Sequence, residues 1–128
     1  MPIDTDFMIV VGGVCGSGKS TLIEGLKKNG FHAHSVAQEH SNAPKMYLMT
    51  KPDYVILLDC NYDTVQERRN VGWTRQQLQD QLYRLRHMRE HCNLFINTEK
   101  CTVDEVLAKA ISAINRFKER GETNGCNT

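Results

Sequence analysis

The sequence predicts an α/β fold of three layers, in which a small, mostly parallel sheet is covered by helices on both faces. Short apolar segments rich in β-branched residues alternate with amphipathic segments of helical period along the chain. Strands connected through helices run parallel, and a parallel sheet needs cover on both faces. The 128 residues, 40% of them hydrophobic and 24% charged, suit a single domain. We expect this domain to span residues 1–120 and residues 121–128 to form a flexible tail.

The order of the elements follows from apolar patterns and from helix-ending or helix-starting residues. Residues 7–11 form a buried strand that ends at a Gly pair, and Asn29-Gly30 ends the first helix. Thr74 and Gln77 have the spacing of a capping box, and Thr102 offers a second cap. The expected strands are residues 7–11, 31–37, 54–58 and 94–97, and the expected helices are 19–28, 61–69, a longer one from 74, and 103–116.

Charge and cysteine content exclude several classes of function. The formal net charge of +1 gives no general attraction to nucleic acid or to an anionic membrane. No apolar stretch reaches the roughly 20 residues that span a bilayer, and the N-terminal residues do not read as a secretory signal. The five cysteines are irregularly spaced, which favours free thiols in a reducing cytoplasm.

The first strand leads into a glycine-rich loop that matches the full spacing of the Walker A motif, G-x-x-x-x-G-K-S. Glycines let the backbone approach phosphate oxygens, and the N–H groups of the loop and of the following helix face an anion. Lys19 is placed to bridge the terminal phosphates, and Ser20 to bind Mg²⁺. The expected ligands of a nucleoside triphosphate are Gly13, Val14, Cys15, Gly16, Ser17, Gly18, Lys19, Ser20 and Thr21.

Two acidic residues follow strands and are candidates to assist the metal. Asp59 ends the apolar segment VILLD, which is the Walker B pattern. Glu39 follows the second strand in a polar group with His40 and Ser41, which suits a site at a strand end. We favour Glu39 as base or metal helper over Asp59, and both stay candidates.

Arginines flank Gly72 and continue along the helix that begins at Thr74. Arginines on a segment over a phosphate site neutralise charge that develops during transfer. For Arg84, Arg86 and Arg89 we expect a solvated helix face instead. His87 and His91 have metal-binding spacing, but no further ligand cluster accompanies them.

Three stretches of the chain resemble P-loop kinases of the nucleotide and nucleoside kinase group, of the thymidylate and adenylate kinase type. They are GGVCGSGKST, PDYVILLDCNYDTVQERR and NLFINTEKCTVDEVLAKAISAI. The resemblance implies the fold of P-loop containing nucleoside triphosphate hydrolases and a preference for adenine. It places Arg68 over the base, Arg69 or Arg75 on the phosphates, and residues 98–102, with Lys100 and Cys101, against the base. QEHS at 38–41 resembles a base-placing segment, with His40 where Arg is expected.

The chain departs from this family on the acceptor side. Only about a dozen residues separate Ser41 from Tyr54, where these kinases insert a long acceptor-binding segment. We therefore expect a central strand and its helices to be missing, and the small size is compatible with a homodimer that completes the site.

The sequence thus predicts an ATP- and Mg²⁺-dependent kinase acting on a nucleoside-like small molecule, with no nucleic-acid or membrane partner. Lys19, Glu39, Arg68 and Arg75 are its expected catalytic residues, and Ser20, Glu39 and Asp59 its expected metal residues. The alternative is a nucleotide-binding regulatory module, or a slow ATPase, that acts through a protein partner.

Overall fold

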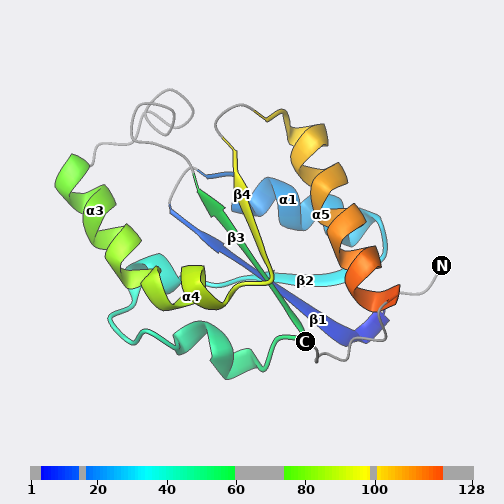
Figure 1. Cartoon of the computed structure of the whole chain (residues 1–128), viewed down its shortest axis with the longest axis horizontal. Helices are drawn as coiled ribbons and strands as arrows, with labels where there is room; N and C mark the ends of the chain where they lie inside the picture. The colour runs from blue at the N-terminus through cyan, green and yellow to red at the C-terminus, as the bar shows by residue number, and fades with distance from the viewer. Residues whose placement is uncertain (1–3, 15–16, 60–73, 99–100, 120–128) are drawn as a thin grey trace.

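The computed structural model describes residues 4–14, 17–59, 74–98 and 101–119 of the chain. Its centre is a sheet of four strands in the order β2-β1-β3-β4, and all the neighbouring strands run parallel (Figure 1). The predicted α/β class is therefore confirmed. The strands are β1 (Asp4–Gly13), β2 (Phe31–Ser35), β3 (Tyr54–Asp59) and β4 (Leu94–Asn97).

Strand β1 lies in the middle of the sheet and ends beside β3. Val11 is opposite Ser35 on one side and Ile56 on the other, and Gly13 is opposite Leu58. Because β1 and β3 run parallel and end together, the loop after Gly13 and the residue after Leu58 share one edge of the sheet. Ligands of parallel α/β sheets bind at this carboxyl edge.

Helices cover both faces of the sheet, as the sequence predicts (Figure 1). Helices α1 (Lys19–Lys28) and α5 (Val103–Glu119) pack on one face, where Leu26, Ile56 and Ile114 are fully buried. Helices α3 (Arg75–Arg84) and α4 (Arg86–His91) cover the other face together with Tyr47. The two apolar faces of the sheet thus stabilise the fold by burying side chains on both sides.

The two predicted helix caps form. The Thr74 hydroxyl accepts from the Gln77 N–H and the Gln77 side chain accepts from the Thr74 N–H, at 3.2 and 2.7 Å. Thr102 and Glu105 exchange the same pair of bonds, at 3.1 and 2.8 Å. Each cap satisfies N–H groups that the first helical turn leaves without a partner.

The single longer helix expected from Thr74 is wrong, because it is divided at Leu85 into α3 and α4. The Gln38 side-chain amide donates to the Arg84 carbonyl oxygen at 3.2 Å, immediately before this division. A side chain that enters the carbonyl ladder of a helix is a known cause of such breaks.

The connection from β2 to β3 contains two short 3-10 turns, η1 (Gln38–His40) and η2 (Met46–Thr50). Strand β2 ends at Ser35, two residues earlier than predicted. The predicted helix over residues 61–69 lies outside the described residues. Within the described part of the chain, no helix combines the length and apolar character needed to cross a membrane.

Candidate functional site

The turn from β1 into α1 brings several backbone segments close together. A Cβ added to Gly13 would lie 2.5 Å from the Leu58 carbonyl oxygen and 2.7 Å from Ser17 Oγ, so only glycine fits there. Gly18 has φ 101°, which glycine adopts without strain, and it is the residue from which α1 starts. The glycines that the motif predicts at 13 and 18 are thus required by the geometry, whereas Cys15 and Gly16 lie outside the described residues.

The first turn of α1 offers donors to an anion. Gly18 has no side chain that could accept from the N–H groups of this turn, and the turn contains no acidic residue. The helix dipole adds positive potential at the same place. Ser20 and Thr21 lie here with exposed side chains. The start of α1 therefore has the donors and the field of a phosphate site.

Ser17 lies buried inside the turn, with 1% of its surface exposed. Its N–H donates to the Val14 carbonyl oxygen at 3.1 Å. Its Oγ is buried and has no hydrogen-bond partner among the residues that the structure describes. A buried hydroxyl without a partner costs about 1–3 kcal/mol. Such an atom suits a site in which a ligand supplies the missing bond.

Lys19 extends from the first turn of α1 across the carboxyl edge of the sheet. Its ammonium donates to the Gly13 carbonyl oxygen at 2.9 Å and forms an ion pair with Glu39 Oε2. Both side chains are largely removed from water, at 15% and 4% exposure. An ammonium has three N–H donors, so one remains for a phosphate oxygen after these two bonds.

The Lys19–Glu39 pair brings Glu39 next to the start of α1, beside the glycine-rich turn. Glu39 stands in the turn η1 after β2, and its side chain reaches the helix that follows β1. His40 Nε2 lies 3.6 Å from the same carboxylate oxygen, and its side chain is 55% exposed. A carboxylate, a lysine and a partly exposed imidazole therefore meet at one place.

The turn that carries Glu39 is held by hydrogen bonds from the side chains of Gln38 and Arg84. Gln38 is completely buried, and its side chain bonds to the Ala43 carbonyl oxygen at 2.8 Å and to the Tyr47 N–H at 2.9 Å. Arg84 donates to the Glu39 carbonyl oxygen at 3.3 Å and to Asn42 Oδ1 at 3.2 Å. The backbone on both sides of the Glu39 side chain is thus fixed.

The expectation that Arg84 lies on a solvated face is therefore wrong. Arg84 is half-buried, because α3 packs against η1 and turns this side chain toward the Glu39 segment. Arg86 and Arg89 are exposed, as expected. The sequence contains no signal for the role of Arg84, since its partners lie about 40 residues away in the chain.

Asp59 ends β3 at the same edge of the sheet. Its carboxylate lies 4.0 Å from an Arg89 nitrogen, and its side chain is 22% exposed. Thr98, which follows β4, has its Oγ1 3.2 Å from both the Asp59 and the Ser17 carbonyl oxygens. Thr98 is 2% exposed, so this residue joins the loop to β3 and does not present its side chain to a base.

The remaining predicted site residues are described only in part. Arg68, Arg69 and Lys100 lie outside the described residues, and Arg75 is the first residue of α3. Cys101 is half-buried, with Sγ 3.6 Å from the Asn97 carbonyl oxygen and 3.4 Å from Lys109 Nζ.

The hydrogen-bond donors and side-chain oxygen atoms of the site fit a phosphate group with a bound metal ion. No group of three or more His, Cys, Asp or Glu side chains suited to a metal lies within the described residues. Mg²⁺ does not require such a cage, because it is held mostly by water and by phosphate oxygens with one or two protein ligands. Ser20, Glu39 and Asp59 have the oxygen atoms that Mg²⁺ prefers.

A second polar group is formed by Tyr47 and two histidines of α4. The Tyr47 hydroxyl is 2.8 Å from His87 Nδ1, and the His87 and His91 rings stack with centroids 4.1 Å apart. Burial, and then the charge of His91, lower the pKa of His87 below its ordinary value of 6.5. Burial raises the pKa of Tyr47. The bond between Tyr47 and His87 thus joins the turn η2 to α4.

Neither the known protein-family models nor the curated protein sequences include a match to this chain.

Proposed function

We propose that this protein is a P-loop kinase that binds ATP with Mg²⁺ and transfers the γ-phosphoryl group to a nucleoside- or nucleotide-like small molecule. The observation that carries the proposal is the Lys19 ammonium, held at the start of α1 between the Gly13 carbonyl oxygen and the Glu39 carboxylate. This arrangement puts a cation, helix donors and an acid at the carboxyl edge of a parallel sheet. The Walker A spacing of the same residues adds independent support.

In this proposal the loop and α1 bind the phosphates of ATP. The backbone N–H groups of the first turn and the third Lys19 N–H donate to β- and γ-phosphate oxygens. Ser20 would hold the magnesium ion, which would supply positive charge to the phosphate oxygens. Adenine is the expected base, with Arg68 and the residues that follow Thr98, up to residue 102, beside it as the family resemblance implies.

Glu39 is the acid best placed to act on an acceptor hydroxyl. Its carboxylate lies beside the lysine that binds the terminal phosphates, so an acceptor positioned for in-line attack would reach it. Arg84 and Gln38 fix its backbone, and the ion pair with Lys19 holds the carboxylate. Asp59, at the end of the neighbouring β3, is the second candidate to assist the metal. Arg75 and the preceding arginines would supply the lid.

A regulatory nucleotide-binding module is the second candidate function. It is favoured by the short connection between β2 and β3, which is built from two 3-10 turns and contains no further strand. Such a connection leaves little chain to bind an acceptor. In this case a protein partner would recognise the ATP-bound form, and the ATP would be hydrolysed slowly.

A screen of ATP consumption against nucleosides, nucleotides and small metabolites separates the two candidates. The variant Lys19→Met removes the phosphate-binding cation, and Lys27→Met changes an exposed lysine at the far end of the same helix as the matched control. We expect ADP formation that requires an acceptor, is lost in Lys19→Met and persists in Lys27→Met. Binding of ATP without turnover on a broad panel would exclude the kinase and support the module. If ATP does not bind at all, both candidates fail.

A cytoplasmic location is part of the proposal. Cys92 and Cys101, the described cysteines, carry free thiols, which is usual for proteins in a reducing compartment.

A further inference from the structure

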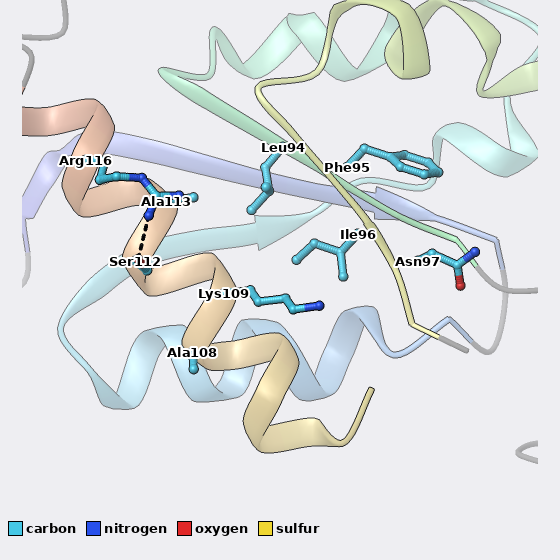
Figure 2. A pocket seen from close by; sticks show the side chains of 9 residues that line it. All are labelled: Leu94, Phe95, Ile96, Asn97, Ala108, Lys109, Ser112, Ala113 and Arg116. Carbon is cyan, nitrogen blue, oxygen red and sulfur yellow. Dashed lines mark hydrogen bonds between the residues drawn. The ribbon is translucent and has the colours of Figure 1, made fainter. Parts of the chain in front are cut away.

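A groove lies on the side of the molecule where the sheet ends, between β4 and α5 (Figure 2). Its volume is about 570 Å³, which falls within the range of ligand-binding clefts. The strand lines one wall and the helix lines the other. Its lining residues are Leu94, Phe95, Ile96, Asn97, Ala108, Lys109, Ser112, Ala113 and Arg116.

The strand wall of the groove has backbone groups available for pairing. Among the described strands, β4 stands at the edge of the sheet, with β3 as its neighbour. The Asn93 N–H, just before the strand, donates to the Val55 carbonyl oxygen of β3 at 2.8 Å. Since backbone groups of successive residues in a strand alternate in direction, those of Leu94 and Ile96 point away from β3. A strand edge without a neighbouring strand can pair with an added one. Leu94 is half-buried here and Ile96, although it lines the groove, is 3% exposed.

The helix wall of the groove is positively charged. Lys109 and Arg116 line it, and the lining contains no acidic residue. Arg116 donates to Ser112 Oγ at 3.0 Å (Figure 2), and Lys109 Nζ lies 3.4 Å from Cys101 Sγ. Within the described part of the chain, neither cation forms an ion pair with a carboxylate.

We propose that this groove binds an extended acidic segment of a partner protein, which adds to β4 as a further strand. Its backbone would bond to Leu94 and Ile96, and its carboxylates would meet Lys109 and Arg116. The two cations are seven residues apart on α5, which is about 10 Å along a helix. Side chains on one face of a strand recur about every 7 Å, and the long side chains of Lys109 and Arg116 can make up the difference of about 3 Å, so acidic residues at alternate positions can reach both cations.

The positive charge of the groove favours an acidic segment over a second copy of the chain as its occupant. Two copies that paired β4 with β4 about a two-fold axis would bring Lys109 and Arg116 of both copies toward one another. Like charges across an interface oppose association, whereas an acidic segment is attracted. The proposal concerns a different part of the molecule from the phosphate loop and stands independently of the proposed kinase activity.

A direct test uses a fluorescein-labelled peptide of about eight residues in which glutamate and valine alternate, titrated with the full chain. We expect saturable binding that weakens as salt is raised. A peptide with lysine in place of glutamate, and the glutamate peptide with alternate amides N-methylated, are expected not to bind. No binding of the acidic peptide at about millimolar protein overturns the proposal.

The variant Lys109→Glu with Arg116→Glu tests the two cations. We expect this double variant to bind the acidic peptide about tenfold more weakly, or weaker still, and to bind the lysine peptide instead. Lys28→Glu is the matched control, because Lys28 and Arg116 are both exposed and both lie in the last turn of a helix. Equal affinity for the double variant and this control contradicts the proposed role of the cations.

Amide hydrogen exchange tests the added strand. We expect the Leu94 and Ile96 amides to become protected by the acidic peptide, while the exposed helix amides of α3 do not change. If the peptide binds and these two amides stay unprotected, the peptide does not extend the sheet and the proposal is wrong.

Discussion

Thr98 Oγ1 lies 3.2 Å from the carbonyl oxygen of Ser17, which is 81 residues earlier in the chain. The same atom is 3.2 Å from the Asp59 carbonyl oxygen, and the Thr98 N–H also donates to that oxygen at 2.8 Å. One buried threonine therefore joins the glycine-rich turn, the end of β3 and the end of β4. Three segments that carry the candidate site are held in register by this residue.

The first prediction concerns this link. Thr98→Val keeps the shape of the side chain and removes the hydroxyl, which leaves the buried Ser17 carbonyl oxygen without this donor. We expect the free energy of unfolding to fall by about 2 kcal/mol, measured by urea denaturation. If the protein binds ATP as proposed, its ATP affinity, measured by calorimetry, should fall as well, because the turn loses its anchor. Thr98→Ser keeps the hydroxyl and is the control; if both variants behave alike, the hydrogen bond is not the anchor.

The second prediction concerns the ion pair between Lys19 and Glu39. Glu39→Ala leaves the largely buried ammonium without its carboxylate, and we expect this to lower the free energy of unfolding by about 3 kcal/mol. The double variant Lys19→Met with Glu39→Ala removes both charges and should recover much of this loss, and Lys19→Met alone completes the set. A double-mutant cycle in urea measures the coupling. Additive effects in the cycle would show that the two side chains do not interact.

The third prediction separates the role of Glu39 in chemistry from its role in the fold. Glu39→Gln keeps the size of the side chain and removes its capacity to accept a proton. If the protein is a kinase, we expect turnover to fall about 10²-fold while the KM for ATP changes little. Asp59→Asn, assayed in parallel, reports on the other candidate acid. A larger loss in Asp59→Asn than in Glu39→Gln would reverse the assignment.

The fourth prediction concerns Arg84 as a positioning residue. Arg84→Met removes the donors to the Glu39 carbonyl oxygen and to Asn42 while it keeps most of the apolar length. We expect the Glu39 turn to loosen, so the amides of residues 39–42 should exchange faster with solvent. Arg86→Met is the matched control, since Arg86 stacks on Tyr83 at the surface, 3.8 Å from the ring centroid. Faster exchange in both variants would assign the effect to loss of charge alone.

The fifth prediction concerns pH. Burial, and then the positive charge of His91, lower the pKa of His87 in the folded chain below 6.5. The unfolded chain therefore binds a proton at His87 more readily than the folded chain does. Stability from this residue is present above pH 6.5 and is lost as the pH falls below that value.

Urea midpoints at pH 7.5 and pH 5.5 test this effect. We expect a lower midpoint at pH 5.5 in the natural chain and a smaller difference in His87→Asn, which keeps an acceptor near the Tyr47 hydroxyl. An unchanged difference in His87→Asn would show that another group titrates.

Much of the fold can be predicted from the sequence because its signals are local. The alternation of apolar and amphipathic segments predicts the α/β class, and the pairs Thr74–Gln77 and Thr102–Glu105 predict two helix starts. Each of these depends on residues within a few positions of one another. Predictions fail where a distant residue intervenes, as Gln38 does where it bonds to Arg84 and α3 gives way to α4.

The candidate site, like the fold, is predicted from the sequence only where its residues are neighbours in the chain. The sequence by itself determined the glycine-rich turn, with Lys19 at the start of a helix, because that motif is continuous in the chain. Only the tertiary structure decided that Glu39 reaches Lys19, that Thr98 joins Ser17 to Asp59, and that Arg84 fixes the Glu39 segment. These partners are 20 to 81 residues apart. The strand order β2-β1-β3-β4, which depends on how the connecting helices pack, brings them to one edge of the sheet.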